Sequence, residues 1–83
     1  MKYSLPVSLI IIELSLPGLD GFGFLTMVKS DPALKDIPVL VLTSRDSREE
    51  KERAVELGAL DCLVKYRLPP AELKNMVKVI VGE

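Results

Sequence analysis

The chain has 83 residues, enough for a single domain over residues 1–83 and close to the lower size at which one core stabilises a fold alone. Hydrophobic residues make up 48% of it and charged residues 28%, which excludes disorder, and the formal charge of −1 gives no reason to expect a nucleic-acid or membrane partner. Histidine is absent, which excludes histidine-based acid–base chemistry, and the single cysteine, Cys62, excludes an internal disulfide and favours a reducing, cytoplasmic setting.

Three short apolar runs predict strands. The runs are Leu9–Ile12, Val39–Leu42 and Leu60–Val64. None alternates cleanly between apolar and polar residues, and continuous runs of this kind favour strands buried on both faces of a parallel sheet. A polar or turn segment and then a candidate helix follow each run. This order predicts an α/β fold with right-handed crossovers.

The first helix is expected to begin near Gly21, with Asp20 as its N-cap, and to end before Pro32. Asp31 precedes that proline and is therefore pushed away from helical dihedral angles. We interpret Asp20 as a helix cap rather than a metal ligand. The side chains expected to face inward are Phe24, Leu25 and Val28.

The second helix has the clearest start signal in the chain. Ser47 to Glu50 fits a capping box, in which the Ser47 side chain caps the helix and the Glu50 side chain reaches back to Ser47. Gly58 is expected to end the helix. The side chains expected to face inward are Ala54, Val55 and Leu57.

The third helix is expected to begin at Pro69-Pro70, because proline is tolerated in the first turn. Lys74 and Lys78 are interpreted as part of a solvated face. If the strands are added in one direction, the first two helices share a face of the sheet and the third lies on the opposite face. The apolar residues that repeat at helical spacing are Leu73, Met76, Val77 and Ile80.

The segment from Leu9 to Gly21 resembles the third strand and following loop of response-regulator receiver domains, in which an aspartate ends the strand. Asp36 to Ser44 resembles the fourth strand, with its hydroxyl residue at the carboxyl end. Ala54 to Ala59 resembles the end of the fourth helix, and Asp61 to Lys65 the fifth strand with its lysine. The resemblance runs from about Ser8 to Ile80. It implies a three-stranded parallel sheet with three helices, the (βα)3 half of a flavodoxin-like receiver fold.

The resemblance also implies roles for four positions at the carboxyl ends of the strands, where open parallel sheets bind ligands. Glu13 takes the position of the phosphate-accepting aspartate. Thr43 takes the position of the hydroxyl that reorients towards the phosphoryl group, although a strand-end hydroxyl that only caps nearby backbone is an equal alternative for it. Lys65 takes the position of the lysine that pairs with the carboxylate or phosphate. The carbonyl of Ser15 takes the position of the backbone metal ligand. All four are expected to meet.

Four departures from the family pattern indicate a degenerate site. Glu13 is one methylene longer than aspartate, and a small misplacement of a nucleophile can cost ~10²-fold in rate. The family's first two strands and helices have no counterpart in these 83 residues, and neither does the acidic pair that holds magnesium, so we expect no cofactor and no metal site. Tyr66 replaces the proline that usually follows the lysine, and Cys62 replaces the switch aromatic residue. We interpret Cys62 as a small buried apolar residue rather than a reactive thiol.

The leading prediction is a non-catalytic, degenerate receiver module that is not an enzyme and acts in signal transduction through protein–protein contacts or self-association. Glu13 would then be a fixed-charge mimic of phospho-aspartate held by Lys65; the alternative is a solvated strand-end carboxylate. We expect a homodimer or larger assembly, in which two copies either place their Leu9–Ile12 strands antiparallel and side by side or stack their uncovered sheet faces, the first being favoured. A signalling protein is a possible further partner. A phosphoacceptor completed by a partner chain, and a fragment without independent activity, are the alternatives.

Overall fold

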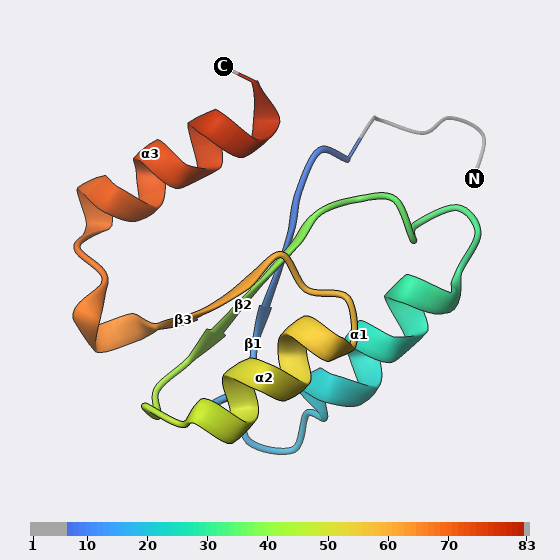
Figure 1. Cartoon of the computed structure of the whole chain (residues 1–83), viewed down its shortest axis with the longest axis horizontal. Coiled ribbons are helices and arrows are strands. Elements are labelled where there is room, and N and C mark those ends of the chain that lie inside the picture. Colours follow the sequence, from blue (N-terminus) through green and yellow to red (C-terminus); the bar gives the residue numbers. More distant parts are fainter. Residues whose placement is uncertain (1–6, 83) are drawn as a thin grey trace.

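The computed structural model describes residues 7–82, in which strands and helices alternate along the chain (Figure 1). The strands are β1 (Ile10–Glu13), β2 (Val39–Thr43) and β3 (Asp61–Val64). The helices are α1 (Gly21–Ser30), α2 (Arg48–Glu56) and α3 (Pro70–Val81), and a short 3-10 helix, η1 (Lys65–Arg67), follows β3. The predicted strands and helices are confirmed to within a residue or two at their ends; η1 was not predicted.

The three strands form one parallel sheet in the order β1-β2-β3. Ile12 lies beside Val41, and Val41 lies beside Cys62. The central strand, β2, carries the most deeply buried side chains of the sheet, since Val39, Leu40 and Val41 are all fully buried. This confirms the parallel α/β fold that the apolar runs predict.

Helices cover both faces of the sheet. In Figure 1, α1 and α2 lie on one face and α3 lies on the other. Alternate residues of β2 divide between the two layers: Val39 and Val41 belong to the cluster with α1 and α2, whereas Leu40 lines a hollow together with Met76 of α3. The prediction that the third helix takes the opposite face is confirmed.

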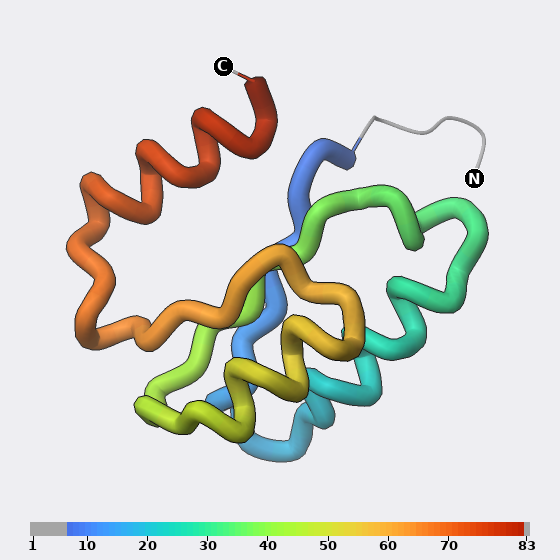
Figure 2. The backbone as a smooth tube through the Cα atoms, in the orientation of Figure 1, coloured from blue at the N-terminus to red at the C-terminus, as the bar shows by residue number. Residues whose placement is uncertain are grey.

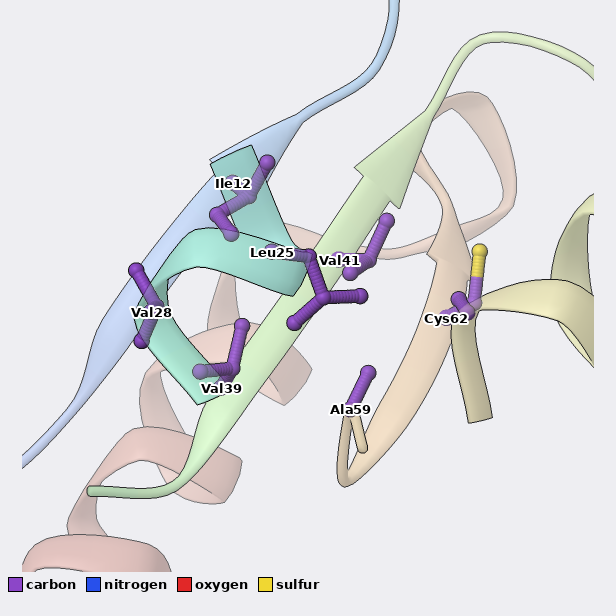
Figure 3. Packing of buried hydrophobic residues seen from close by; sticks show 8 residues of the cluster. Ile12, Leu25, Val28, Val39, Val41, Ala59 and Cys62 are labelled. Atoms are coloured by element: carbon purple, nitrogen blue, oxygen red, sulfur yellow. The ribbon is translucent and has the colours of Figure 1, made fainter. Parts of the chain in front are cut away.

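The core lies between the sheet and the α1–α2 layer (Figure 3). Leu25 and Val28 project from α1 onto the strands and are 0% and 1% exposed. The other buried members of the cluster are Ile12, Val39, Val41, Ala54, Ala59 and Cys62. Burying such side chains is the main favourable contribution to folding, so this layer holds the fold together.

Helix α3 is packed less closely than α1 and α2. None of its residues is buried, although its apolar stripe is half-buried and the intervening Lys74 and Val79 are exposed. Figure 2 shows α3 extending from η1 along the side of the sheet away from α1 and α2. The predicted stripe is therefore correct in direction, but α3 covers its face of the sheet only in part. The half-buried residues are Leu73, Met76, Val77 and Ile80.

The residues predicted to cap or end the helices do so. The Asp20 side chain accepts a hydrogen bond from the Gly23 backbone N–H at 3.0 Å, and the Ser47 hydroxyl accepts one from the Glu50 N–H at 3.2 Å. Gly58, just past α2, has a φ of +108°, a left-handed conformation that glycine adopts without strain. Asp20, Ser47 and Gly58 are thus confirmed as helix-end residues.

Two predicted core residues are wrong. Phe24 of α1 and Val55 of α2 are both 48% exposed. Phe24 directly precedes the fully buried Leu25, and Val55 directly follows the fully buried Ala54. Successive residues of an α-helix are rotated by about 100° about its axis. The buried neighbour occupies the centre of the inward face, which turns Phe24 and Val55 to its flank. The partly buried residue that packs against the core from α1 is instead Phe22.

Candidate functional site

The carboxyl ends of the three strands lie at one edge of the sheet and carry three of the predicted site residues. Glu13 is the last residue of β1, Thr43 is the last residue of β2, and Lys65 directly follows β3. A parallel sheet brings these ends together because all its strands run in the same direction. What the side chains contact there differs from one residue to the next.

Glu13 and Lys65 form an ion pair, with the Lys65 ammonium donating to a carboxylate oxygen of Glu13. The two residues are 52 positions apart in the chain, and the pair spans from the end of β1 to the end of β3. The Lys65 side chain is 45% exposed and the Glu13 side chain 26% exposed. An ion pair so open to water contributes only about 0–1 kcal/mol to stability. Its effect is to fix the position of the carboxylate and to neutralise both charges.

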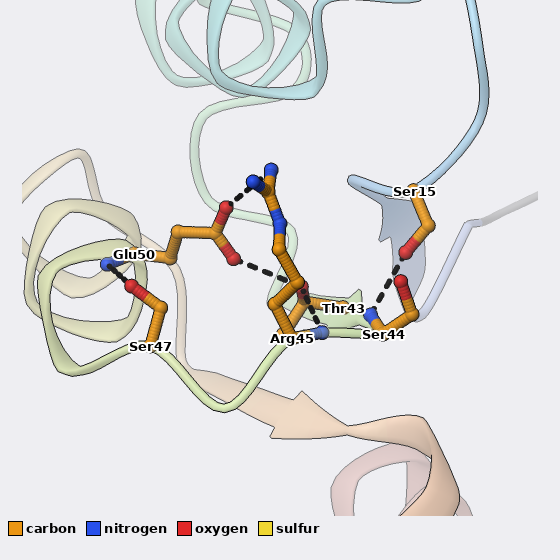
Figure 4. Close-up of polar contacts among 6 residues, drawn as sticks. All are labelled: Ser15, Thr43, Ser44, Arg45, Ser47 and Glu50. Atoms are coloured by element: carbon orange, nitrogen blue, oxygen red, sulfur yellow. Dashed lines mark hydrogen bonds and ion pairs between the residues drawn. The ribbon is translucent and has the colours of Figure 1, made fainter.

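The Thr43 hydroxyl contacts a side chain of α2 (Figure 4). The hydroxyl donates to Oε1 of Glu50 at 2.9 Å and accepts from the Arg45 backbone N–H at 3.1 Å. The residue is only 3% exposed. The predicted meeting of Thr43 with Glu13 and Lys65 is therefore not seen in the side-chain contacts of residues 7–82.

Glu50 links Thr43 to a second charged group. Its Oε2 lies 2.9 Å from a guanidinium nitrogen of Arg45, while its Oε1 accepts from Thr43 (Figure 4). The predicted return of the Glu50 side chain to Ser47 is wrong, because a buried hydroxyl and a guanidinium together offer stronger partners than the single backbone N–H of Ser47. Sequence reasoning missed this role of Glu50, since the capping pattern explained the residue completely.

Ser15 connects the loops that follow β1 and β2. Its hydroxyl accepts a hydrogen bond from the Ser44 backbone N–H at 2.8 Å (Figure 4). The prediction concerned the Ser15 carbonyl as a metal ligand, and the side-chain contact was not anticipated. The contact holds the loop after Glu13 against the loop after Thr43 and so fixes the spacing of the two strand ends.

Residues of η1 form the outer rim of the site. Arg67 makes an ion pair of 2.7 Å with Asp46, which joins η1 to the loop after β2. The Arg67 guanidinium also lies over the ring of Tyr66, 5.5 Å from its centroid. Tyr66 itself is 65% exposed. The rim is therefore built from surface charges and one exposed ring beside Lys65.

The remaining chemistry of the described chain is limited. Among residues 7–82, no group of three or more His, Cys, Asp or Glu side chains is placed to hold a metal ion. Cys62 is free and buried, and burial raises the pKa of its thiol, with the charges of Glu50 and Asp61 adding to the rise and that of Lys51 opposing it. A thiol in this position stays protonated and weakly nucleophilic. No helix within residues 7–82 is both long enough and apolar enough to cross a membrane.

Comparison with known proteins gives one consistent family. Residues 3–78 match the model of the response regulator receiver domain. The phosphate regulon transcriptional regulatory protein PhoB of Klebsiella pneumoniae is 36% identical over 73 residues, which is 88% of this chain and 31% of the relative. Among solved structures, the signal receiver domain of a DNA binding response regulator from Colwellia psychrerythraea is 30% identical with a TM-score of 0.81, over 92% of this chain and 61% of that one.

A third similar structure is the BeF3-activated N-terminal receiver domain of RstA from Klebsiella pneumoniae. It is 28% identical with a TM-score of 0.77, over 92% of this chain and 62% of that one. The chain thus spans about a third of the regulator PhoB and about three fifths of the two solved receiver chains. In the two solved structures the likeness lies within a receiver domain.

Proposed function

This chain belongs to the response regulator receiver domain family of signal transduction, and on that premise we propose that it is a non-catalytic receiver module that works through protein contacts without accepting a phosphoryl group. The observation that carries the proposal is the ion pair between Glu13 and Lys65 at the carboxyl ends of the strands. Glu13 stands where the receiver family has its phosphate-accepting aspartate. The site therefore already contains the charge contact that a phosphorylated acceptor would make with the lysine.

The geometry of Glu13 disfavours its use as a nucleophile. Its carboxylate reaches one methylene further than an aspartate, which displaces the attacking oxygen from the position that the family uses. Attack on a phosphoryl donor needs a free, in-line oxygen and a metal ion to neutralise charge on the transferred group. We therefore propose that the site binds no magnesium ion, which is supported by the finding that residues 7–82 place no group of three or more acidic side chains to hold one.

The hydroxyl of Thr43 supports a fixed rather than a switching site. It donates to Glu50, which is itself paired with Arg45, and the residue is almost completely buried. Turning the hydroxyl towards Glu13 would take this donor from the part-buried carboxylate of Glu50 and lose one hydrogen bond, at a cost of about 0.5–1.5 kcal/mol. A second candidate function, a phosphoacceptor completed by a partner chain, would require that turn.

A module of this kind signals by what it binds. We propose a signalling protein partner and contacts with a second copy of the chain. We also propose a cytoplasmic location, supported by the free thiol of Cys62 within the core.

The test is incubation of the chain with magnesium and a small-molecule phosphoryl donor such as acetyl phosphate, followed by intact-mass spectrometry. The receiver domain of RstA provides a positive control, because it was solved in its BeF3-activated form. We expect a phosphoryl adduct on the control and none on this chain. Stoichiometric phosphorylation of Glu13 would contradict the proposal and would favour the phosphoacceptor function instead.

The matched variant is Glu13→Asp, which restores the acceptor of the family. If side-chain length alone blocks the chemistry, this variant will gain an adduct that the unaltered chain lacks. If the variant also stays unmodified, the block includes the missing acidic ligands. In both cases the unaltered chain is expected to remain without a phosphoryl group.

A further inference from the structure

A hollow of about 430 Å³ opens on the β3 side of the sheet, between the first turn of α2 and η1. Strand β3 and the first turn of α3 line it as well. All the residues that line it lie between positions 43 and 72, and none belongs to β1 or α1. Its volume lies within the range of about 300–1,000 Å³ that is usual for small-molecule sites.

Basic side chains gather around this hollow out of proportion to their number. Four of the chain's 11 basic residues line it, against two of its 12 acidic residues, Asp46 and Glu72. A hollow lined mainly by charges of one sign concentrates the electrostatic potential and attracts ions of the opposite sign. The hollow is therefore suited to an anion. The four basic residues are Arg45, Arg48, Lys51 and Arg67.

Two of these basic side chains are already paired, and both stay open to water. The guanidinium of Arg45 lies 2.9 Å from the Glu50 carboxylate, and that of Arg67 lies 2.7 Å from the Asp46 carboxylate. The two arginine side chains are 75% and 60% exposed. Since a guanidinium has five N–H donors, one acidic partner leaves donors free for a second acceptor.

Arg48 and Lys51 supply the positive charge that is least balanced. They lie three positions apart on α2 and so share one side of the helix. The ammonium of Lys51 is 3.8 Å from a carboxylate oxygen of Asp61, the longest ion pair among residues 7–82. Arg48 forms no ion pair with any residue in that range. An anionic group beside these two cations would meet little competition for them.

The hollow also offers apolar contact. Leu63 and Val64 of β3 and Leu68, directly after η1, line it, and all three are half-buried. An inorganic ion would leave these side chains in contact with water, whereas an organic anion would cover them, which is favourable. The occupant that fits both features is a small molecule with an anionic group and an apolar body.

We propose that this hollow binds a small organic phosphate, with its phosphate group beside Arg48 and Lys51 and its apolar body against Leu63 and Leu68. A phosphate ester suits the hollow better than a carboxylate because it carries more negative charge and three acceptor oxygens, and basic side chains line the hollow from both α2 and η1. The inference goes beyond the proposed function, because it concerns a small molecule and not a protein contact.

The test is a titration of the full chain with phenyl phosphate, followed through the amide shifts of two-dimensional ¹H–¹⁵N NMR spectra. We expect saturable shifts concentrated in residues 45–51 and 62–68, which surround the hollow. Phenol, which lacks the charge, and inorganic phosphate, which lacks the apolar body, should each bind more weakly than phenyl phosphate. Equal or tighter binding of either, or shifts spread over the whole surface, would overturn the inference.

Arg48→Ala removes the cation without an acidic partner and should weaken the binding of phenyl phosphate about threefold to fivefold. The matched control is Lys74→Ala, which removes the same charge from an exposed position of α3 outside the hollow and should leave binding unchanged. Because Arg48 and Lys74 are both exposed, both variants should keep the circular dichroism of the unaltered chain. Equal weakening by the two variants would mean that only net charge matters and would refute the site.

A tetra-aspartate peptide distinguishes a small-molecule site from a docking site for an acidic protein segment. We expect the peptide to bind more weakly than phenyl phosphate, since it brings no apolar body to Leu63 and Leu68. Saturable shifts with the peptide and none with phenyl phosphate would overturn the inference in favour of a protein partner. The absence of saturable shifts with either compound would overturn it outright.

Discussion

Replacing Glu50 with alanine tests whether its contact with Thr43 is a structural anchor at the end of β2. The substitution removes the acceptor of the nearly buried Thr43 hydroxyl, which lies 2.9 Å from Oε1 of Glu50. A buried donor left without a partner costs about 1–3 kcal/mol. The lost ion pair with Arg45 adds little, because the Arg45 side chain is 75% exposed.

The matched control is Glu49→Ala. Glu49 is the neighbouring acidic residue in the first turn of α2, and it is exposed. Both glutamates gain the same small stabilisation from the helix dipole, about 0.3–1 kcal/mol, so the difference between the two variants isolates the contact with Thr43. We expect Glu50→Ala to be less stable than Glu49→Ala by about 1–2 kcal/mol. A domain of this length has a total stability of about 4–12 kcal/mol, so the loss is a large fraction.

The assay is urea denaturation followed by circular dichroism, with all variants at one concentration because association contributes to apparent stability. A double-mutant cycle with Thr43→Val completes it. Glu50→Ala should cost clearly less in the Thr43→Val background, where no hydroxyl needs an acceptor. Equal midpoints for the two glutamate variants, or no coupling in the cycle, would refute the anchoring role.

Three further predictions concern the core, the thiol and the ion pair. Leu25→Ala, in the fully buried core, should lower the free energy of unfolding by about 2–5 kcal/mol, and Ile80→Ala, on half-buried α3, should lower it by less. Lys74→Ala should change it by no more than about 0.5 kcal/mol. Denaturation midpoints in any other order would contradict the packing described above. Cys62 should react slowly with iodoacetamide until the chain unfolds. The pKa of the Cys62 thiol is raised in the folded state, so the protonated thiol favours folding below the pKa of the unfolded thiol, and this contribution is lost as the pH rises through the folded pKa. Cys62→Ala should therefore flatten the decline of the unfolding free energy at alkaline pH. An unchanged decline would count against this. Lys65→Met should change stability by no more than about 1 kcal/mol, and less at high salt; a larger, salt-independent loss would mean that the pair is not solvent-screened.

The strands and helices could be predicted from sequence because their signals are local. The apolar runs gave the three strands, and Asp20, Ser47 and Gly58 marked helix ends through hydrogen bonds to residues within three positions or through one backbone angle. The parallel topology followed from the alternation of strands and helices. Each of these features depends on neighbours in the chain rather than on contacts across the fold.

The errors arose where distant or competing partners decide. Glu50 fits a capping box in sequence, but the fold places the Thr43 hydroxyl and the Arg45 guanidinium within its reach. Phe24 and Val55 have the right character for a core, yet each lies beside a residue that already fills the inward face of a short helix. The spacing of residues in the sequence does not distinguish a capping glutamate from one with tertiary partners, or the centre of a helix's buried face from its flank.

The site itself was identified through resemblance to a family rather than through spacing. Glu13 and Lys65 are 52 residues apart, and only the shared strand positions of receiver domains relate them in sequence. The structure brings this pair into contact and directs Thr43 elsewhere. Side-chain direction at the end of a strand depends on the next loop and helix, which the family pattern does not specify.

The central claim is that the chain is a receiver whose acceptor site takes no phosphoryl group. The most direct measurement is a calorimetric titration of the full chain with beryllium fluoride and magnesium, with the RstA receiver as positive control because it was solved in its BeF3-activated form. We predict no saturable heat for this chain, because the longer side chain of Glu13 displaces the acceptor oxygen, no group of three or more acidic side chains among residues 7–82 is placed to hold magnesium, and the Thr43 hydroxyl is bound to Glu50. Saturable binding at sub-millimolar concentration, lost on substitution of Lys65, would contradict the account.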